Sequence, residues 1–187
     1  MADWDQIYLD KSVGESKPAR VLLDNQHLLP LGGKALDYAS GLSANGVFLA
    51  NHGFDVTAWD LSDVAVDKVN AYAIEKKLAL HAKKIDIEKS LDTLQGEFDV
   101  IVVSFFLHRE SLSELYKLLK PCGLLFYQTF SGEQLNGVGP SRSDFRLRRG
   151  ELLKIFSSMK LLSYREDYAF SASENVIADQ VFFVAQK

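Results

Sequence analysis

The sequence predicts an α/β fold in which helices cover both faces of a doubly wound, mostly parallel sheet. Three observations support this prediction. Residues 32–53 contain a short apolar run, a loop of small residues and an apolar-patterned helix, the unit that opens a nucleotide-type fold. Strand-like and helix-like segments then alternate as far as residue 129. In addition, an aspartate closes each of the first three predicted strands, which brings three acids to one edge of a parallel sheet.

The composition limits the kind of protein. With 187 residues, of which 47% are apolar and 25% charged, the chain suits one domain with a full core, and we expect a single domain over residues 1–187. A net charge of −4 gives no electrostatic reason to expect nucleic acid as a partner. One cysteine, an acidic N-terminus without a signal-peptide pattern and the lack of an apolar run of ~20 residues predict a cytoplasmic protein with no membrane partner.

Residues 1–30 are expected to form a helical cap. Apolar side chains recur at helical spacing near the N-terminus, at Trp4, Ile7, Tyr8 and Leu9. This segment is either a helix packed on the domain or a lid whose aromatic side chains, with Arg20, cover a ligand. An amphipathic helix at Val21–Leu29 follows, and Pro30 stops it together with two glycines.

The middle of the chain carries the other parallel strands and their helices. In residues 54–59 apolar and polar side chains alternate, and the segment is rich in residues that favour strands. Ser62 is in position to cap a helix that runs to Lys76 and Lys77. Residues 98–103 are apolar apart from Asp99, which is typical of a central strand covered on both faces. The remaining expected elements are a strand at Leu80–Ile85, a helix at Ser111–Lys120 that Pro121 stops, and a strand at Gly123–Thr129.

Residues 131–150 interrupt this alternation and are expected to form a loop over the active site. They are rich in glycine and serine and carry Arg142, Arg146, Arg148 and Arg149. These arginines either form a lid over an anion or belong to a solvated basic loop. A helix at Glu151–Met159 and two strands, Leu161–Tyr168 and Gln180–Ala185, close the chain. Because a short acid-containing turn at 171–175 separates the two strands, we expect them to pair antiparallel.

Three acids suggest the charge of the ligand. Asp37, Asp60 and Asp86 each end a predicted strand, so they are expected along one crevice of the sheet. Asp60 lies at about the ~20-residue spacing of an acid that accepts hydrogen bonds from a ribose diol. Asp86 is placed to accept from the exocyclic amine of a base, with Leu61 and Ile87 offering apolar faces to its ring. An acid beside the first turn repels a phosphate and attracts a cation.

Two cofactor classes compete for this pattern. A nicotinamide dinucleotide needs its pyrophosphate on a G-x-G-x-x-G turn, whereas residues 39–44 read A-S-G-L-S-A after an acid. S-adenosylmethionine has no phosphate but carries a cationic sulfonium and an ammonium group. An acidic rim therefore favours S-adenosylmethionine.

The ordered motifs resemble those of class I S-adenosylmethionine-dependent methyltransferases, and most of all the small tellurite-resistance-type members. Those have an opening motif near D-L-A-C-G-x-G, which stands here as D-Y-A-S-G-L-S at 37–43. The likeness continues through F-D-V-T-A-W-D-L-S at 54–62, D-I at 86–87, F-D-V-I-V-V-S-F-F-L-H-R at 98–109 and L-K-P-C-G-L-L at 119–125. The resemblance implies a seven-stranded Rossmann-like sheet in the order 3-2-1-4-5-7-6 with strand 7 antiparallel.

The resemblance also implies roles for individual residues. Asp37 would meet the methionine amino group through the turn formed by Ala39, Ser40 and Gly41. The expected partners of the rest of the cofactor are Asp60 for the ribose hydroxyls, Asp86 and Ile87, beside Leu61, for the adenine, and Ser104 for the floor near the sulfonium. Three positions depart from the family pattern: Ser43 replaces the last motif glycine, Ser40 the usual cysteine and Cys122 a common glycine. If residue 43 has a positive φ, serine there costs on the order of 1 kcal/mol.

Methyl transfer sets modest demands on side chains. A soft anionic nucleophile such as a thiolate or a chalcogen oxyanion needs no general base, whereas an amine or hydroxyl needs one. His108 is the candidate base, with capping or packing as its alternative role. Arg109 either binds an anionic substrate or pairs with Glu110 or Glu114, and Tyr8 closes the pocket from the N-terminal side. No metal site is expected, because the other histidines, His27, His52 and His81, lack companions at ligand spacing.

The sequence therefore predicts a methyltransferase that uses S-adenosylmethionine and acts on a small molecule, with a thiol or a tellurium or selenium oxyanion as the acceptor that the resemblance suggests. It is expected to be a monomer or a homodimer. Two alternatives remain open at this point. One is a non-catalytic protein that binds S-adenosylmethionine, motivated by Ser43, and the other is a nicotinamide-dependent oxidoreductase.

Overall fold

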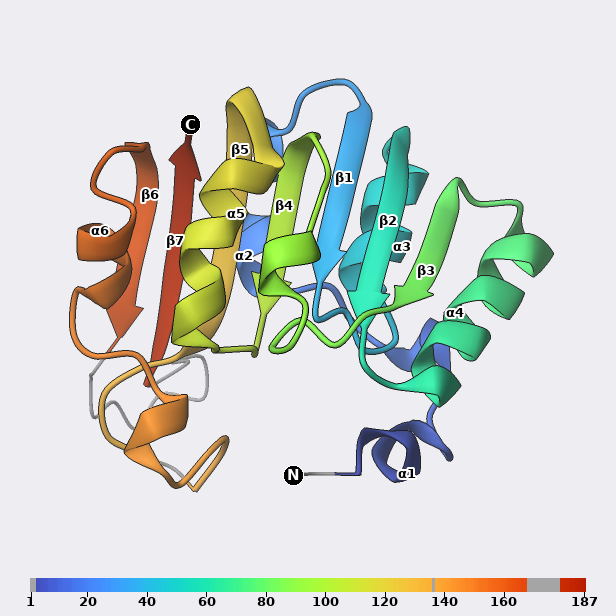
Figure 1. Cartoon of the computed structure of the whole chain (residues 1–187), viewed down its shortest axis with the longest axis horizontal. Coiled ribbons are helices and arrows are strands. Elements are labelled where there is room, and N and C mark those ends of the chain that lie inside the picture. The colour runs from blue at the N-terminus through green and yellow to red at the C-terminus, as the bar shows by residue number, and fades with distance from the viewer. Residues whose placement is uncertain (1–2, 136, 168–178) are drawn as a thin grey trace.

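The computed structural model describes residues 3–135, 137–167 and 179–187, which build a seven-stranded sheet in the order β3-β2-β1-β4-β5-β7-β6 (Figure 1). The pairs from β3 to β5 are parallel, whereas β7 is antiparallel to both β5 and β6. The predicted strand order and antiparallel strand 7 are confirmed. The strands are β1 (Gly33–Tyr38), β2 (Phe54–Asp60), β3 (Leu80–Lys84), β4 (Phe98–Ser104), β5 (Leu119–Phe130), β6 (Lys160–Asp167) and β7 (Gln180–Gln186).

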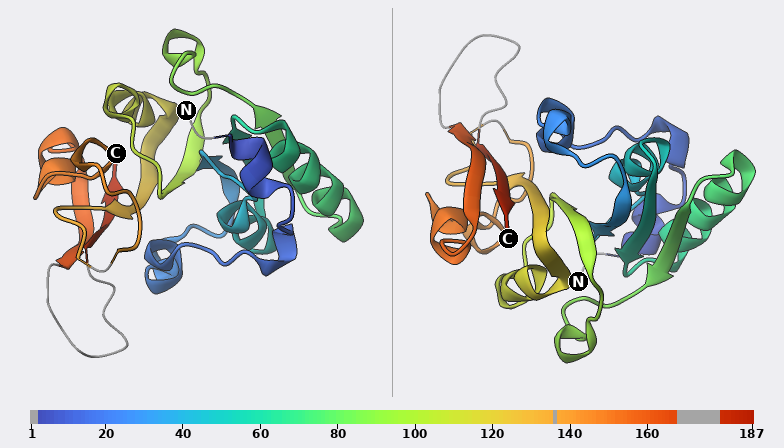
Figure 2. Two further views of the ribbon diagram at one scale, coloured as in Figure 1. Left: turned by 90° about the horizontal axis from the view of Figure 1, so that it is seen from below. Right: turned by 90° about the horizontal axis from the view of Figure 1, so that it is seen from above.

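Helices cover both faces of the sheet, as the end views in Figure 2 show. One apolar cluster joins α2 (Arg20–Asp24), α3 (Ala44–Asn51) and α4 (Asp63–Lys76) to one face, and a second joins α5 (Leu112–Leu118) and α6 (Glu151–Ile155) to the other. The central strand β4 contributes to both clusters, because Val100 and Val102 face the first and Ile101 and Val103 the second, all four fully buried. Burying each such side chain stabilises the fold by about 1.5–3 kcal/mol.

The carboxyl ends of the five parallel strands lie along one edge of the sheet, at the bottom of Figure 1. Two further segments reach this edge: α1 (Trp4–Tyr8) and the loop that follows β5. In an open α/β sheet this edge is where ligands bind. The fold thus places the N-terminal segment and the described residues between 131 and 150 beside the edge where a ligand would lie.

Several predicted boundaries were wrong. The helix expected at Val21–Leu29 is split into α2 and a 3-10 turn (Gln26–Leu28), because Asn25 leaves helical geometry and donates its side-chain amide to the carbonyl of Val21 at 2.9 Å. The helix expected at Ser111–Lys120 ends at Leu118, and β5 begins ahead of the proline. A residue before proline favours extended backbone, so the chain leaves the helix early.

Other boundaries shifted by one to four residues. Helix α4 begins as predicted, since the Ser62 hydroxyl accepts a hydrogen bond from the Ala65 N–H at 3.1 Å. The strand predicted at Leu80–Ile85 ends at Lys84, and the helix predicted at Glu151–Met159 ends at Ile155. Strands β6 and β7 form the expected antiparallel pair, but the turn predicted at 171–175 lies outside the described residues. Within the described ranges, no helix has the length and apolar character that crossing a membrane requires.

Candidate cofactor and acceptor site

A cavity of about 880 Å³ lies at the carboxyl edge of the sheet. Its walls come from the N-terminal segment, from the loops after β1, β2, β3 and β4, from the end of β5 and from the loop that follows it. This volume is in the upper part of the range for small-molecule and cofactor sites. The cavity brings together most of the predicted cofactor residues: Ala39, Ser40, Gly41, Asp60, Leu61, Asp86, Ile87 and Ser104.

Asp37 is the predicted cofactor residue that does not line the cavity. Strand β1 continues to Tyr38, so the Asp37 side chain points into the protein and is fully buried. Its carboxylate accepts hydrogen bonds from the Ser43 hydroxyl at 2.9 Å, the Asn45 amide at 3.1 Å and the Gly46 N–H at 3.0 Å. Because this carboxylate does not line the cavity, the contact with a methionine amino group that the resemblance implies stays a prediction, and it would have to act through the turn. Asp37 holds the β1–α3 turn in shape from behind.

Asp37 makes stability depend on pH. Burial raises the pKa of its carboxyl to about 7, against the opposing effect of its three hydrogen-bond donors. A raised folded-state pKa means that the folded chain keeps a proton that the unfolded chain releases, so this group's contribution to stability falls as pH rises from about 4 to about 7. Urea denaturation of the native chain and Asp37→Asn over this range should show the difference in unfolding free energy between them declining. A difference that is constant or rises with pH would contradict this account.

The turn contains two strained residues. Ala39 and Ser43 both have a left-handed backbone, with φ of 53° and 52°. The φ of Ser43 meets the condition under which serine was expected to be costly. However, the same conformation lets the Ser43 hydroxyl donate to the buried carboxylate of Asp37. The departure from the family's glycine is therefore part of the hydrogen bonding that supports the turn.

Replacing Ser43 with glycine is expected to destabilise the protein. Above pH 7, where the Asp37 carboxyl is ionised, relief of the left-handed strain gains about 1 kcal/mol, but the charge-assisted hydrogen bond lost is worth about 1.5–3 kcal/mol. Cys122 is the matched control, because it is exposed and has a φ of 65°. In urea denaturation, Cys122→Gly should raise the free energy of unfolding by about 1 kcal/mol, while Ser43→Gly should lower it. Equal stabilisation by both substitutions would show that the Ser43–Asp37 bond contributes nothing.

Asp60 ends β2 at the cavity wall and is 8% exposed. One carboxylate oxygen accepts from the Gly41 N–H at 2.6 Å and the other from the Ser62 N–H at 3.0 Å. Burial raises the pKa of Asp60, and these two backbone donors oppose the rise. Since a carboxylate has about four acceptor positions, Asp60 retains capacity to bind hydroxyl groups in the cavity.

The next wall carries Asp86, Ile87 and Leu61. Asp86 lies two residues beyond the end of β3, so the prediction that it ends this strand was wrong by that margin. Its carboxylate pairs with Lys89 at 2.8 Å, and this contact lowers the pKa of Asp86. An exposed pair of this kind is worth less than about 1 kcal/mol and does not prevent Asp86 from contacting a ligand. Ile87 is buried and gives this wall an apolar surface.

Ser40 offers a test of whether a ligand fits. Its hydroxyl is buried at the cavity wall and has no hydrogen-bond partner among the described residues. A buried polar group without a partner calls for an explanation, and a bound ligand with a polar group beside the turn supplies one. The carboxylates lining the cavity in the described part of the chain are Asp60, Asp86 and Glu88. This wall suits a ligand that combines hydroxyl groups with positive charge.

Of the three predicted catalytic residues, one lines the cavity and two lie outside its lining. Tyr8 lines the cavity, and its hydroxyl lies so close to Gly41 that a Cβ there would approach it to 2.5 Å. His108 and Arg109 lie outside the lining. His108 contacts Glu110 at 3.0 Å, while Arg109 forms an ion pair at 2.7 Å with Glu151, a partner the sequence did not suggest. The structure therefore does not bring His108 and Arg109 to the site.

The N-terminal segment is both a packed helix and part of the cavity wall. Asp5 accepts hydrogen bonds from the Ser62 hydroxyl at 2.6 Å and from the Val64 N–H at 3.1 Å, which fixes α1 to the start of α4. Tyr8 on the same helix lines the cavity. The two interpretations offered for residues 1–20 are thus compatible.

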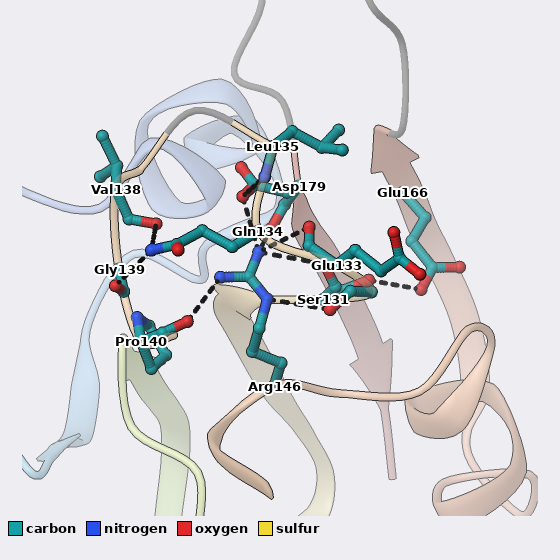
Figure 3. A network of polar contacts seen from close by, with 11 residues as sticks. Ser131, Glu133, Gln134, Leu135, Val138, Gly139, Pro140, Arg146, Glu166 and Asp179 are labelled. Carbon is teal, nitrogen blue, oxygen red and sulfur yellow. Dashed lines mark hydrogen bonds and ion pairs between the residues drawn. The ribbon is translucent and has the colours of Figure 1, made fainter. Parts of the chain in front are cut away.

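Arg146 organises the loop after β5 (Figure 3). Its guanidinium is buried, contacts the Asp179 carboxylate at 2.6 Å and donates to the carbonyls of Gly132 at 2.9 Å and Pro140 at 3.1 Å. Further donations reach the carbonyls of Ser131, Glu133 and Asp179. For Arg146 neither prediction was right, since it forms neither a lid over an anion nor part of a solvated surface. It is a scaffold for the loop that carries Pro140 and Phe145 to the cavity.

Two functional positions were missed by sequence reasoning. Asn45 donates to Asp37 and to the Ser104 hydroxyl at 3.0 Å, and its oxygen accepts from the Ala19 N–H at 2.8 Å. Gln128 accepts from the Val21 N–H at 2.9 Å. Both line the cavity. A glutamine inside the apolar run of β5 was a signal that could have identified Gln128, whereas nothing around Asn45 marks it.

With this geometry described, comparisons with known proteins assign the family. The family described as "Tellurite resistance protein TehB" matches residues 21–170. The chain belongs to the TehB family. This family and the observed sheet order agree with the resemblance to class I S-adenosylmethionine-dependent methyltransferases.

Curated relatives agree with this TehB-family assignment. The chain is 26% identical over 145 residues to "Probable S-adenosyl-L-methionine-dependent methyltransferase TehB" of Haemophilus influenzae, covering 72% of this chain and 48% of the relative. It is 27% identical over 133 residues to "Ubiquinone biosynthesis O-methyltransferase" of Nitrosococcus oceani, covering 68% and 56%. The chain therefore spans about half the length of the curated relatives it matches.

A solved structure supports the fold. The crystal structure of TehB from Haemophilus influenzae superposes with a TM-score of 0.73 at 21% identity, over 98% of this chain and 67% of that one. At this identity the likeness concerns the fold alone. This likeness agrees with the sheet order β3-β2-β1-β4-β5-β7-β6 observed in the present chain. The described residues contain no group of three or more histidine, cysteine or acidic side chains that could hold a metal ion.

Proposed function

We propose that the chain transfers a methyl group from S-adenosylmethionine to a small molecule whose reacting atom is a thiol sulfur or the tellurium or selenium of an oxyanion. The observation that carries the proposal is how charge is distributed in the cavity. The described carboxylates of its lining all lie in the region of β2 and β3, and the unpartnered hydroxyl of Ser40 lies beside them. An adenosyl group with a cationic sulfur matches that wall.

The residues assigned to the cofactor follow from this arrangement. Asp60 binds the ribose hydroxyls, while Asp86 and Ile87, with Leu61, hold the adenine. The turn at residues 39–41 and the hydroxyl of Ser104 receive the methionine portion. When bound, S-adenosylmethionine supplies a methyl carbon already activated for displacement. The cavity's task is to hold the acceptor in line with that carbon and to exclude water.

The cavity wall supports a soft acceptor because it offers no suitable base. No histidine occurs in the described lining. Its carboxylates, Asp60, Asp86 and Glu88, lie near the ends of β2 and β3, on the side that we call the cofactor wall. Burial raises the pKa of Tyr8 to about 12, so its phenol stays protonated near neutral pH and acts in positioning and closure rather than as a base. An acceptor that ionises by itself needs no proton removed. An amine or alcohol would need a base that this wall lacks.

A radiolabelled methyl-transfer assay tests the proposal. The acceptors are a panel of thiols, tellurite, selenite, amines and carboxylates, each with the same chain and cofactor concentration. Transfer to thiols or chalcogen oxyanions, with none to amines, is the expected result. Cofactor binding without transfer to any acceptor would overturn the proposal and favour a non-catalytic protein that binds S-adenosylmethionine.

A further inference from the structure

Aromatic side chains dominate the half of the cavity that faces away from the proposed cofactor wall. Phe105 follows β4, Phe130 ends β5 and Phe145 comes from the loop that Arg146 holds; all three line the cavity. The rings of Phe105 and Phe130 lie 5.4 Å apart between centroids. Phe105 is 53% exposed and Phe145 50% exposed, which is unusual for phenylalanine in a folded protein. We call these three residues the aromatic wall.

The aromatic wall is held in place by specific contacts. Phe105 has a left-handed backbone, with a φ of 55°, and its N–H donates to the Gln128 carbonyl at 2.8 Å. A bulky residue adopts this conformation only where the surroundings enforce it, and such strain gathers at functional sites. Phe130 packs under the guanidinium of Arg146, which lies 5.2 Å from its ring centroid. These contacts hold the backbone of Phe105 and the ring of Phe130 in the lining of the cavity.

The cationic side chain of Arg20 also belongs to the lining, and the N–H of the next residue bonds to the end of β5. The N–H of Ala19 donates to Asn45 and the N–H of Val21 to Gln128, so Arg20 is held between the first turn of α3 and the end of β5. Arg20 lines the cavity, and its ion pair with Asp24 at 3.2 Å is about half exposed on both sides. Such a pair is weak enough to exchange for a ligand anion. Lys11 and Lys17 add positive charge to the same lining.

We infer that the methyl acceptor is an aromatic thiol that reacts as its thiolate, with its ring against the aromatic wall and its negative charge facing Arg20. This inference rests on the proposed function and narrows it from soft nucleophiles in general to an organic one. A small hydrated oxyanion would leave the phenylalanines in contact with water and gain nothing from them. A flat aromatic body covers them, and charge complementarity selects its ionised form.

The transfer step balances without a protein base. A bond forms between the thiolate sulfur and the methyl carbon as the bond from that carbon to the donor sulfur breaks. The electron pair of the broken bond stays on the donor sulfur, which becomes a neutral thioether, and the acceptor becomes a neutral methyl sulfide. No proton moves in the step, in agreement with the lack of a base in the described lining.

Acceptor selectivity provides the test. Methyl-transfer rates are measured for thiophenol, 2-mercaptoethanol and tellurite with the native chain, Phe105→Ala and Ile74→Ala, the last removing an exposed apolar side chain on α4, outside the cavity lining. We expect kcat/KM to favour thiophenol over both other acceptors by at least about tenfold. Phe105→Ala should lower kcat/KM for thiophenol about tenfold more than it lowers kcat/KM for 2-mercaptoethanol, whereas Ile74→Ala should leave both unchanged. Calorimetry with S-adenosylhomocysteine present should show weaker thiophenol binding by Phe105→Ala than by Ile74→Ala.

Arg20 is tested through the pH profile. Arg20→Gln should move the rise of thiophenol methylation to higher pH, because the cation that favours the bound thiolate is gone, and Arg20→Lys should restore it. Tellurite methylated as efficiently as thiophenol, or an equal loss for all acceptors in Phe105→Ala, would overturn the inference and leave the proposed function intact. Transfer to no acceptor, with the cofactor bound, would overturn both.

Discussion

Asp60→Ala is expected to weaken binding of S-adenosylmethionine by on the order of 3 kcal/mol, which is about a hundredfold in Kd. With the cofactor placed as proposed above, the substitution removes two charge-assisted hydrogen bonds to the ribose hydroxyls. It also removes the carboxylate that accepts from the Gly41 N–H at 2.6 Å, so the turn beside the cofactor loses its support. Isothermal titration calorimetry with S-adenosylmethionine measures the effect directly.

Asp55→Ala is the matched control, because Asp55 is an exposed carboxylate near the start of the same strand, away from the cavity. It should bind the cofactor like the native chain. Asp60→Asn separates the two causes: it keeps one acceptor oxygen, so its loss should fall between those of the native chain and Asp60→Ala. An unchanged Kd in Asp60→Ala would show that the ribose assignment is wrong.

Arg146→Leu is expected to destabilise the fold by about 3–5 kcal/mol, the usual cost of removing one partner from a buried ion pair. The Asp179 carboxylate would stay buried without its cation, and five backbone carbonyls would lose donors. This loss is a large part of the free energy of unfolding of a typical domain, which is about 5–15 kcal/mol. Urea denaturation followed by circular dichroism gives the free energy of unfolding.

Arg142→Leu serves as the control for this prediction. Arg142 lies in the same loop and forms an ion pair with Asp144 at 2.9 Å, but both side chains are largely exposed. The loss of that pair should cost less than about 1 kcal/mol. If the two substitutions destabilised the protein equally, the burial of Arg146 would have no energetic meaning, and its role as scaffold of the loop would be refuted.

The fold could be predicted because its information is local and periodic. The segment 98–103, apolar apart from Asp99, identifies a central strand whichever way its side chains point. Ser62 marks the start of α4 because it is a residue type that caps helices. Predicted helix boundaries were wrong where a single side chain competed with the backbone for a hydrogen bond of the helix. At Asn25 an amide that reaches back to Val21 ends α2, and no periodicity reveals that choice.

The cofactor wall was also largely predictable, since strand ends fix its residues. Asp60, Ser40 and Asp86 reach the cavity because each lies at, or two residues beyond, the carboxyl end of a parallel strand at the same edge. Asp37 did not, because β1 runs one residue further and turns its carboxylate inward.

The positions of Arg20 and Arg146 could not be predicted from the sequence. Arg20 is held in place by the hydrogen bonds of its two chain neighbours. Ala19 bonds to a side chain that is 26 positions away in the sequence, and Val21 to one that is 107 positions away. Arg146 is set by Asp179, 33 positions on. These contacts exist only once the sheet has formed, and a list of residue types does not contain them. The loop arginines therefore resembled a charged surface in the sequence and proved to include a buried scaffold.

A crystal structure of the chain with S-adenosylhomocysteine tests the central claim most directly. The account predicts the adenosyl group in the cavity at the ends of β1, β2 and β3, with the ribose hydroxyls within about 2.6–3.2 Å of the Asp60 carboxylate and the adenine beside Asp86 and Ile87. A ligand bound anywhere else, or a saturated crystal whose cavity holds only water, would contradict it.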